Sequence, residues 1–200
     1  MTSIDGQQKA QDATRRRRAD AERNIATILD AALDCFTANP QVSVGAIAEA
    51  AGIGRVTVYA HFPSRQALLE AVLDRAIDEA LAAIDSDTIA GAPPDEAMRR
   101  LIRSSWSVLE RHRVLSALAS RELEPDRLRA HHDVVLKRVE ALIARGRSDG
   151  TFRTDLPRGW LVTTFYSLLH AACEDVNAGR LQRRDIARIL ERTLLSALRA

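Results

Sequence analysis

Residues 42–62 leave little choice of local structure. Their apolar side chains are spaced for two short helices that cross closely, with a turn at Gly52 between them. Glycine can enter left-handed backbone space at little steric cost, so the chain can reverse direction sharply there. Ser43 stands just before the first helix, where its hydroxyl can cap a free backbone N–H. The segment therefore predicts a helix-turn-helix.

The second helix of this pair buries Val58 and Phe62 on one side. Its other side carries the guanidinium of Arg55, the hydroxyl of Thr57, the phenol of Tyr59 and the imidazole of His61. Such groups suit phosphate oxygens and base edges, and a helix of this kind can lie in a DNA major groove. The alternative is a purely structural helical hairpin, in which Tyr59 and His61 satisfy local backbone groups.

The stretch that ends at residue 69 resembles the DNA-binding domain of the TetR family of transcriptional regulators. The resemblance is carried by residues 44–48, 50–53, 57–62 and 63–69. It implies phosphate contacts from Ser43, Thr57, Tyr59, His61 and Arg65, and base contacts from Arg55, Val56 and Ala60, with Arg55 choosing guanine. Two positions depart from the family's usual pattern: Gly54 replaces a capping Ser or Thr, and Gly45 replaces a larger, often charged residue.

Composition agrees with an all-α fold, because only 4% of the 200 residues are aromatic while Ala, Leu and Arg are abundant. No region is apolar enough to span a bilayer, and the first residues lack a secretion signal. We therefore expect a cytoplasmic protein with no membrane partner. Cys35 and Cys173 are far apart in apolar helical patterns, so we expect core thiols, with no disulfide, metal or cofactor.

Three segments are expected: a flexible basic arm at 1–18, the helix-turn-helix domain at 19–66, and a C-terminal domain at 67–200. Acidic and basic side chains balance over residues 1–75, so net charge does not identify a DNA-binding half. The dense cluster is Arg15 to Arg18, which can follow a minor groove or remain a solvated tail. Capping by Ser64 predicts a helix to about Ile84, which in the family is the lever moved by effectors.

The remaining helices are expected at about 95–112, 114–119, 125–146, 157–177 and 184–198. The resemblance implies that the C-terminal bundle encloses a small-molecule effector of unknown identity. Candidate lining residues are Met98, Trp106, Leu109, Leu118, His132, Val135, Val139, Phe165, Leu169 and His170. The apolar members also fit a plain core, and His170 can pair with Glu174 instead of a ligand. Trp160, near a helix start, is expected to pack.

Wide apolar stripes on the last two helices favour a homodimer, and TetR-like regulators usually dimerise there. The candidate interface residues are Leu161, Leu168, Ala172, Val176, Ile186, Ile189, Leu190, Leu194 and Leu198. The alternative is that these stripes only reflect the core of a monomer. A dimer predicts a palindromic operator in double-stranded DNA, because two symmetric helices require an inverted repeat.

Catalysis is not expected, because the sequence has no Glu-x-x-His repeats, phosphate-binding glycine loop, nucleophile elbow or Cys-x-x-Cys. The sequence therefore predicts a ligand-responsive DNA-binding regulator, more simply a repressor than an activator. A helical ligand-binding or scaffold protein that never contacts DNA is the alternative.

Overall fold

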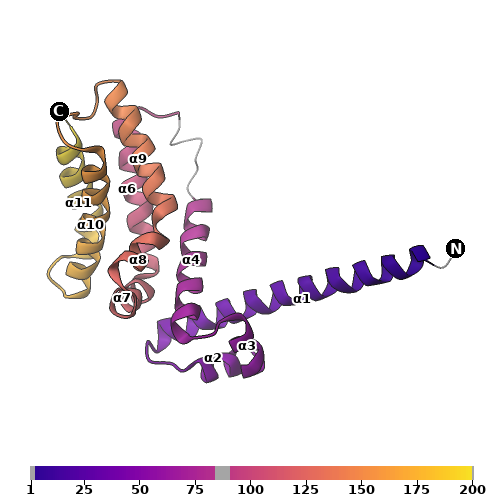
Figure 1. Ribbon diagram of the computed structural model, residues 1–200. Coiled ribbons are helices and arrows are strands. Elements are labelled where there is room, and N and C mark those ends of the chain that lie inside the picture. Colours follow the sequence, from indigo (N-terminus) through magenta and orange to yellow (C-terminus); the bar gives the residue numbers. More distant parts are fainter. Residues whose placement is uncertain (1–2, 84–90, 200) are drawn as a thin grey trace. The chain divides into compact units, whose positions relative to one another are not determined.

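The computed structural model describes the backbone of residues 3–83 and 91–199. This part of the chain is all-α, with a single isolated β-bridge between Phe152 and Arg199 (Figure 1). Its helices are α1 (Ser3–Ala38), α2 (Val44–Ala50), α3 (Arg55–His61), α4 (Arg65–Ala83), α6 (Pro94–Arg111), α7 (Arg113–Glu122), α8 (Pro125–His131), α9 (Asp133–Ser148), α10 (Arg158–Asn177) and α11 (Arg183–Leu198). Every described helix is too short or too polar to cross a membrane.

The chain forms two compact units, Met1–Val72 and Leu73–Ala200. The division falls inside α4, a little beyond the boundary predicted between residues 66 and 67. Helix α4 therefore belongs to both units and is the covalent link between them. Its start agrees with the predicted cap, since the Ala67 N–H donates to Ser64 Oγ at 3.0 Å.

Helix α1 begins at Ser3, well before residue 19, where the sequence predicted its start. The backbone of the predicted flexible arm is thus helical from residue 3. Ala, Gln, Lys and Arg, which make up much of this segment, are all good helix formers. Whether Arg15 to Arg18 contact DNA stays a prediction.

The core of the N-terminal unit joins α1, α2, α3 and the first turns of α4. Phe36, Ile47, Val58 and Leu68 are each fully buried there. These four side chains come from four different helices, so tertiary packing holds the short helices α2 and α3 in place. Seven-residue helices need this support, because helices of that length are unstable alone in water.

In the C-terminal unit, α6, α9, α10 and α11 pack against one another (Figure 1). The shared core is built from apolar side chains of all four, including Leu101, Ile143, Phe165 and Leu194. The helix-ending signals hold here: Gly150 and Gly179 adopt φ of 77° and 72° after α9 and α10. Left-handed backbone at these glycines lets the chain turn back toward the bundle.

Gly146 in α9 supports the fully buried ring of Phe152, and the Phe152 N–H donates to the Gly146 carbonyl at 2.9 Å. A Cβ at residue 146 would lie 2.1 Å from a ring carbon of Phe152, and this ring is buried in the core, so the ring or the helix would have to shift. We expect Gly146→Ala to lower the free energy of unfolding by about 1–3 kcal/mol, although alanine favours helix. Chemical denaturation checks this, with Gly159→Ala as the control because a Cβ there meets nothing within 4 Å. Equal stability of both variants would contradict the prediction.

The single helix predicted over 125–146 is divided into α8 and α9 at His132. The His132 N–H donates to the Arg129 carbonyl at 2.9 Å, one residue short of α-helical pairing. The Leu128 carbonyl, which that N–H would otherwise bind, instead contacts His132 Nδ1 at 2.8 Å. The imidazole thus replaces a backbone donor, and hydrophobic spacing alone could not reveal this break.

Candidate functional site

The turn between α2 and α3 has the predicted geometry. Ser43 caps α2, because the Ala46 N–H donates to Ser43 Oγ at 3.2 Å. Gly52 has φ 65°, and the following Ile53 N–H donates to the Ala48 carbonyl at 3.0 Å. These local bonds fix the angle at which α3 leaves α2 and give α3 a defined outer face.

The outer face of α3 is open to solvent. Val56 is 85% exposed and Tyr59 is 49% exposed, and Arg55 and Ala60 are exposed as well. Thr57 and His61 are half-buried at the edges of the helix, and Val58 alone is completely buried. An exposed valine and an exposed tyrosine on a short helix beside an arginine form a surface that can enter a groove and meet base edges.

Gly45 lies directly beneath the Arg55 side chain. A Cβ at residue 45 would lie 2.8 Å from the guanidinium carbon of Arg55. The missing side chain therefore leaves room for the guanidinium to rest on α2. This explains the departure from the family's pattern at position 45, since a larger residue there would displace Arg55.

Arg65 is half-buried and contacts the loop before α2. Its Nε donates to the Val42 carbonyl at 3.2 Å, a second guanidinium nitrogen binds the Pro40 carbonyl, and the group lies 5.0 Å from the centre of the Phe36 ring. These contacts tie the loop before α2 to α4. Arg65 therefore helps to hold the N-terminal unit together, and its predicted phosphate contact stays a prediction.

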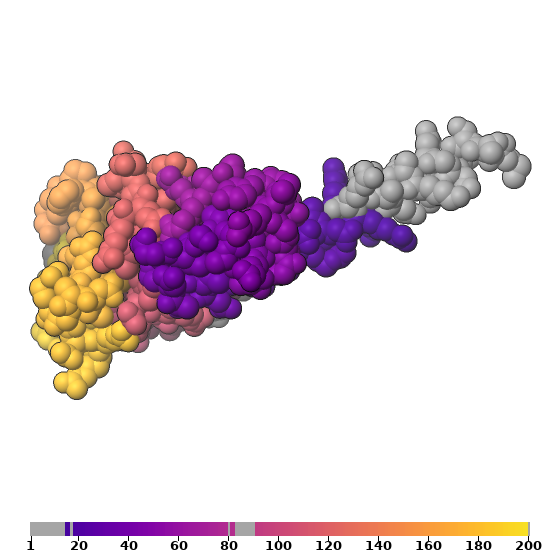
Figure 2. All heavy atoms as spheres, turned by 90° about the horizontal axis from the view of Figure 1, so that it is seen from below, coloured from indigo at the N-terminus to yellow at the C-terminus, as the bar shows by residue number. Residues whose placement is uncertain are grey.

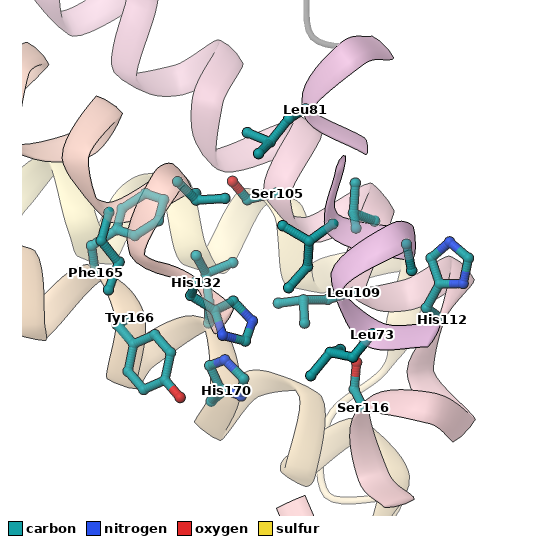
Figure 3. A pocket seen from close by; sticks show the side chains of 16 residues that line it. Leu73, Leu81, Ser105, Leu109, His112, Ser116, His132, Phe165, Tyr166 and His170 are labelled. Carbon is teal, nitrogen blue, oxygen red and sulfur yellow. The ribbon is translucent and has the colours of Figure 1, made fainter. Parts of the chain in front are cut away.

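The C-terminal unit contains a cavity that is partly open to solvent (Figure 3). Its walls come from α4, α6, α7, α9 and α10, together with the His132 junction between α8 and α9. Six of the predicted lining residues are present: Leu109, His132, Val135, Phe165, Leu169 and His170. Four are not: Met98, Trp106 and Val139 lie in the bundle core, and Leu118 is buried on α7 away from the cavity.

Several lining residues were missed by the sequence analysis. Helix α4 contributes Leu73, Ala76, Ile77 and Leu81, and polar groups come from Ser105, His112, Ser116 and Tyr166, with Val108 and Leu136 completing the list. The apolar face of α4 was visible in the sequence, yet nothing local shows that it faces a cavity. Tyr166 had a usable signal, because it precedes His170 by one helical turn.

Three rings gather at one end of the cavity, those of His132, Tyr166 and His170 (Figure 3). The His132 and His170 ring centres are 5.0 Å apart at 83°, and those of Tyr166 and His170 are 4.3 Å apart at 41°. Burial and the neighbouring His132 lower the pKa of His170 to about 4. Burial also lowers the pKa of His132, against its bond to Leu128. Both imidazoles are therefore neutral at pH 7.

Two comparisons with known proteins bear on identity. A family model described as bacterial regulatory proteins of the tetR family matches residues 28–72. The transcriptional repressor LfrR of Mycolicibacterium smegmatis is 31% identical over 181 residues, covering 88% of this chain and 91% of the repressor. This chain belongs to the TetR family. It is a DNA-binding transcriptional regulator and not an enzyme.

Further similarities support the TetR assignment over most of the chain. The transcriptional regulator NfxB of Pseudomonas aeruginosa is 26% identical over 179 residues, covering 87% of this chain and 91% of the regulator. A crystal structure of LfrR in complex with proflavine has a TM-score of 0.62 and 28% identity, covering 90% of this chain and 98% of that one. Proteins of the TetR family bind operator DNA and small-molecule effectors and act as dimers.

The predicted dimer residues of this TetR regulator are mostly in its own core. Leu161, Ala172, Ile186, Leu190, Leu194 and Leu198 are buried within one chain, whereas Leu168, Val176 and Ile189 are only partly buried. The six buried side chains belong to the core that α10 and α11 share with α6 and α9. The dimer through these two helices stays a prediction.

Proposed function

We propose that this regulator is a ligand-responsive repressor that binds an inverted-repeat operator as a homodimer and releases it when a small molecule occupies the cavity. The observation that carries the proposal is the course of α4. This helix begins in the N-terminal unit at Arg65, and Leu73, Ala76, Ile77 and Leu81 on its later turns form a cavity wall. A ligand that displaces this wall moves a helix that also belongs to the N-terminal unit.

On the DNA side, we propose that Arg55, Val56, Tyr59 and Ala60 meet bases and backbone in the major groove. Ser43, Thr57 and His61 lie beside them and supply phosphate contacts. The exposure of α3 and the capping of α2 support this assignment. The relative LfrR is named a repressor, which supports repression as the sign of regulation. We expect the protein in the cytoplasm, where operator DNA is found in bacteria.

On the ligand side, LfrR has been crystallised with proflavine, which supports small-molecule binding by a similar chain. The test uses operator DNA found by footprinting the promoters of its own and neighbouring genes. We expect an effector to lower operator affinity, and linkage requires operator DNA to lower effector affinity by the same factor. Fluorescence anisotropy measures the first effect and calorimetry the second. An effector that saturates the cavity without changing operator affinity would contradict the proposal.

For the dimer, we propose the outer face of α10 and α11. Along α10 this face carries Trp160, Thr164, Leu168 and Ala171 at helical spacing, and Trp160 is 59% exposed, contrary to the packing expected for it. On α11 we propose the partly buried Ile189 as a further member of this face. Figure 2 shows residues from the C-terminal part of the chain, in yellow, at the surface. An exposed tryptophan beside small residues is typical of a surface that another chain covers.

We expect Ala171→Glu to convert the dimer to a monomer at micromolar concentration, because a carboxylate would be buried without a partner at the interface. Analytical ultracentrifugation measures the change. The control is Ala141→Glu, at an exposed alanine of α9, which should remain dimeric. A folded Ala171→Glu protein that stays dimeric would exclude this face.

A further inference from the structure

We infer that the cavity selects an uncharged, ring-bearing ligand that donates a hydrogen bond to the imidazole pair of His132 and His170, and that it rejects permanent cations. This inference rests on the proposed function for its biological meaning, since it names the class of effector. It rests on the lining of the cavity for its chemistry.

The first step is the charge of the lining. None of the sixteen lining side chains given by the structure is Asp, Glu, Lys or Arg. Most of the wall is aliphatic or aromatic, so a charged ligand would lose its hydration without gaining a counter-ion. An uncharged ligand avoids this penalty.

A cation is already present beside the ring cluster. The Arg129 guanidinium lies 5.0 Å from the centre of the Tyr166 ring and also donates to Thr163 Oγ1 at 3.4 Å. Arg129 is not part of the lining, so it offers no pairing to an anion inside the cavity. Its positive charge repels a second cation near Tyr166, and His170 packs against the same ring. Aromatic contact with Tyr166 is therefore a poor site for a cationic ligand.

The tautomer of His132 decides whether a ligand must donate or accept a hydrogen bond. His132 Nδ1 faces the Leu128 carbonyl, which can only accept, so Nδ1 carries the hydrogen. In the neutral ring Nε2 is then an acceptor. Neither His132 Nε2 nor the ring nitrogens of His170 have a hydrogen-bond partner among the described residues. A ligand O–H or N–H supplies the missing donor, and an isostere without it leaves the acceptor unsatisfied.

The end of the cavity at His132 and His170 favours a flat ligand. Tyr166 and the two imidazoles present ring faces and edges at this end, and Phe165 is a further aromatic residue of the lining (Figure 3). Rings that meet edge to face or offset contribute attraction beyond their buried area. A flat ring carrying one donor therefore satisfies both the aromatic walls and the acceptor.

The test uses three naphthalenes of similar size. 2-Naphthol is uncharged and has a donor, 2-methoxynaphthalene is uncharged without a donor, and N,N,N-trimethyl-2-naphthylammonium is a permanent cation. Calorimetry with the full chain at pH 7.5 should show 2-naphthol binding at least about tenfold more tightly than the methyl ether, as expected for one unsatisfied buried acceptor. The cation should bind at least about 100-fold more weakly than 2-naphthol.

Variants assign the donor's partner. At least one of the variants His132→Phe and His170→Phe should bring the ratio of the affinities for 2-naphthol and its methyl ether close to one. The ether needs no acceptor, so its unchanged affinity shows that the cavity is intact. The matched control is His112→Phe, a histidine at the other end of the cavity in Figure 3, which should keep the full ratio. A ratio that survives in both imidazole variants overturns the inference, as does a cation that binds like naphthol or a failure of both neutral probes to bind.

Operator binding is measured separately with the same compounds. If 2-naphthol binds with the expected selectivity but leaves operator affinity unchanged, the ligand-release proposal fails and the inference about ligand chemistry stands. If the cation binds and releases the operator as well as the neutral compounds do, the inference fails and ligand-responsive repression stands.

Discussion

Val56→Glu is expected to weaken operator binding strongly while leaving the fold unchanged. Val56 is 85% exposed on α3, so no packing is lost, but each dimer would bring two carboxylates against the DNA. A wrong contact in a half-site costs about 1–3 kcal/mol, and the symmetric pair doubles it. The expected loss is therefore about 30-fold to 10⁴-fold in operator affinity, measured by anisotropy at fixed salt.

The matched control is Val134→Glu, which places the same substitution on the other valine that is largely exposed, at 51% on α9. It should keep normal operator affinity, which separates a local effect at α3 from the change in net charge. Arg55→Ala offers a second measure, because loss of one specific guanine contact should relax sequence preference at a single position in each half-site. Normal operator binding by Val56→Glu would remove α3 from the DNA interface.

Lowering the pH from 7.5 to 5 is expected to destabilise the C-terminal unit through His170. Its pKa is lowered from 6.5 to about 4 in the folded state. Between these pH values the imidazole binds a proton in the unfolded chain but stays neutral in the folded chain. The stabilising contribution is complete above pH 6.5 and is lost as the pH falls toward 4. Between pH 6.5 and pH 4, this single residue lowers the free energy of unfolding by an amount on the order of 2–3 kcal/mol.

Chemical denaturation at pH 7.5 and pH 5 checks the sign, with His170→Phe as the comparison. The substituted protein should lose less stability between the two pH values, because a phenylalanine does not titrate. Part of the slope should remain, since burial lowers the pKa of neighbouring His132 as well. Equal losses in both proteins would mean that His170 is solvated or charged in the folded state.

The elements that were predictable from the sequence are those fixed by nearby residues. Ser43, Ser64 and Gly52 act on backbone groups within a few positions, so their residue types announce the caps and the turn. The break at His132 is also local in the structure, yet it depends on an imidazole reaching the Leu128 carbonyl rather than on a preferred helix breaker. No propensity scale separates that arrangement from an uninterrupted helix.

The cavity and the dimer face were less predictable because they depend on what packing leaves empty or uncovered. Trp106 and Leu109 are neighbours on α6 and share one apolar stripe, but Trp106 enters the core and Leu109 faces the cavity. In the same way, Leu194 on α11 is buried within its own chain while Ile189 is only partly covered. Periodicity gives the inward side of a helix and does not give the identity of its neighbours.

The continuity of α4 also determines where the protein can be cut. An isolated DNA-binding fragment that ends after Val72 would stop in the middle of a helix. One that extends to Ala83 would bring Leu73, Ile77 and Leu81 into water, although all three are buried in the intact chain. Either fragment is prone to fraying or self-association, so studies of DNA recognition are best made on the undivided polypeptide.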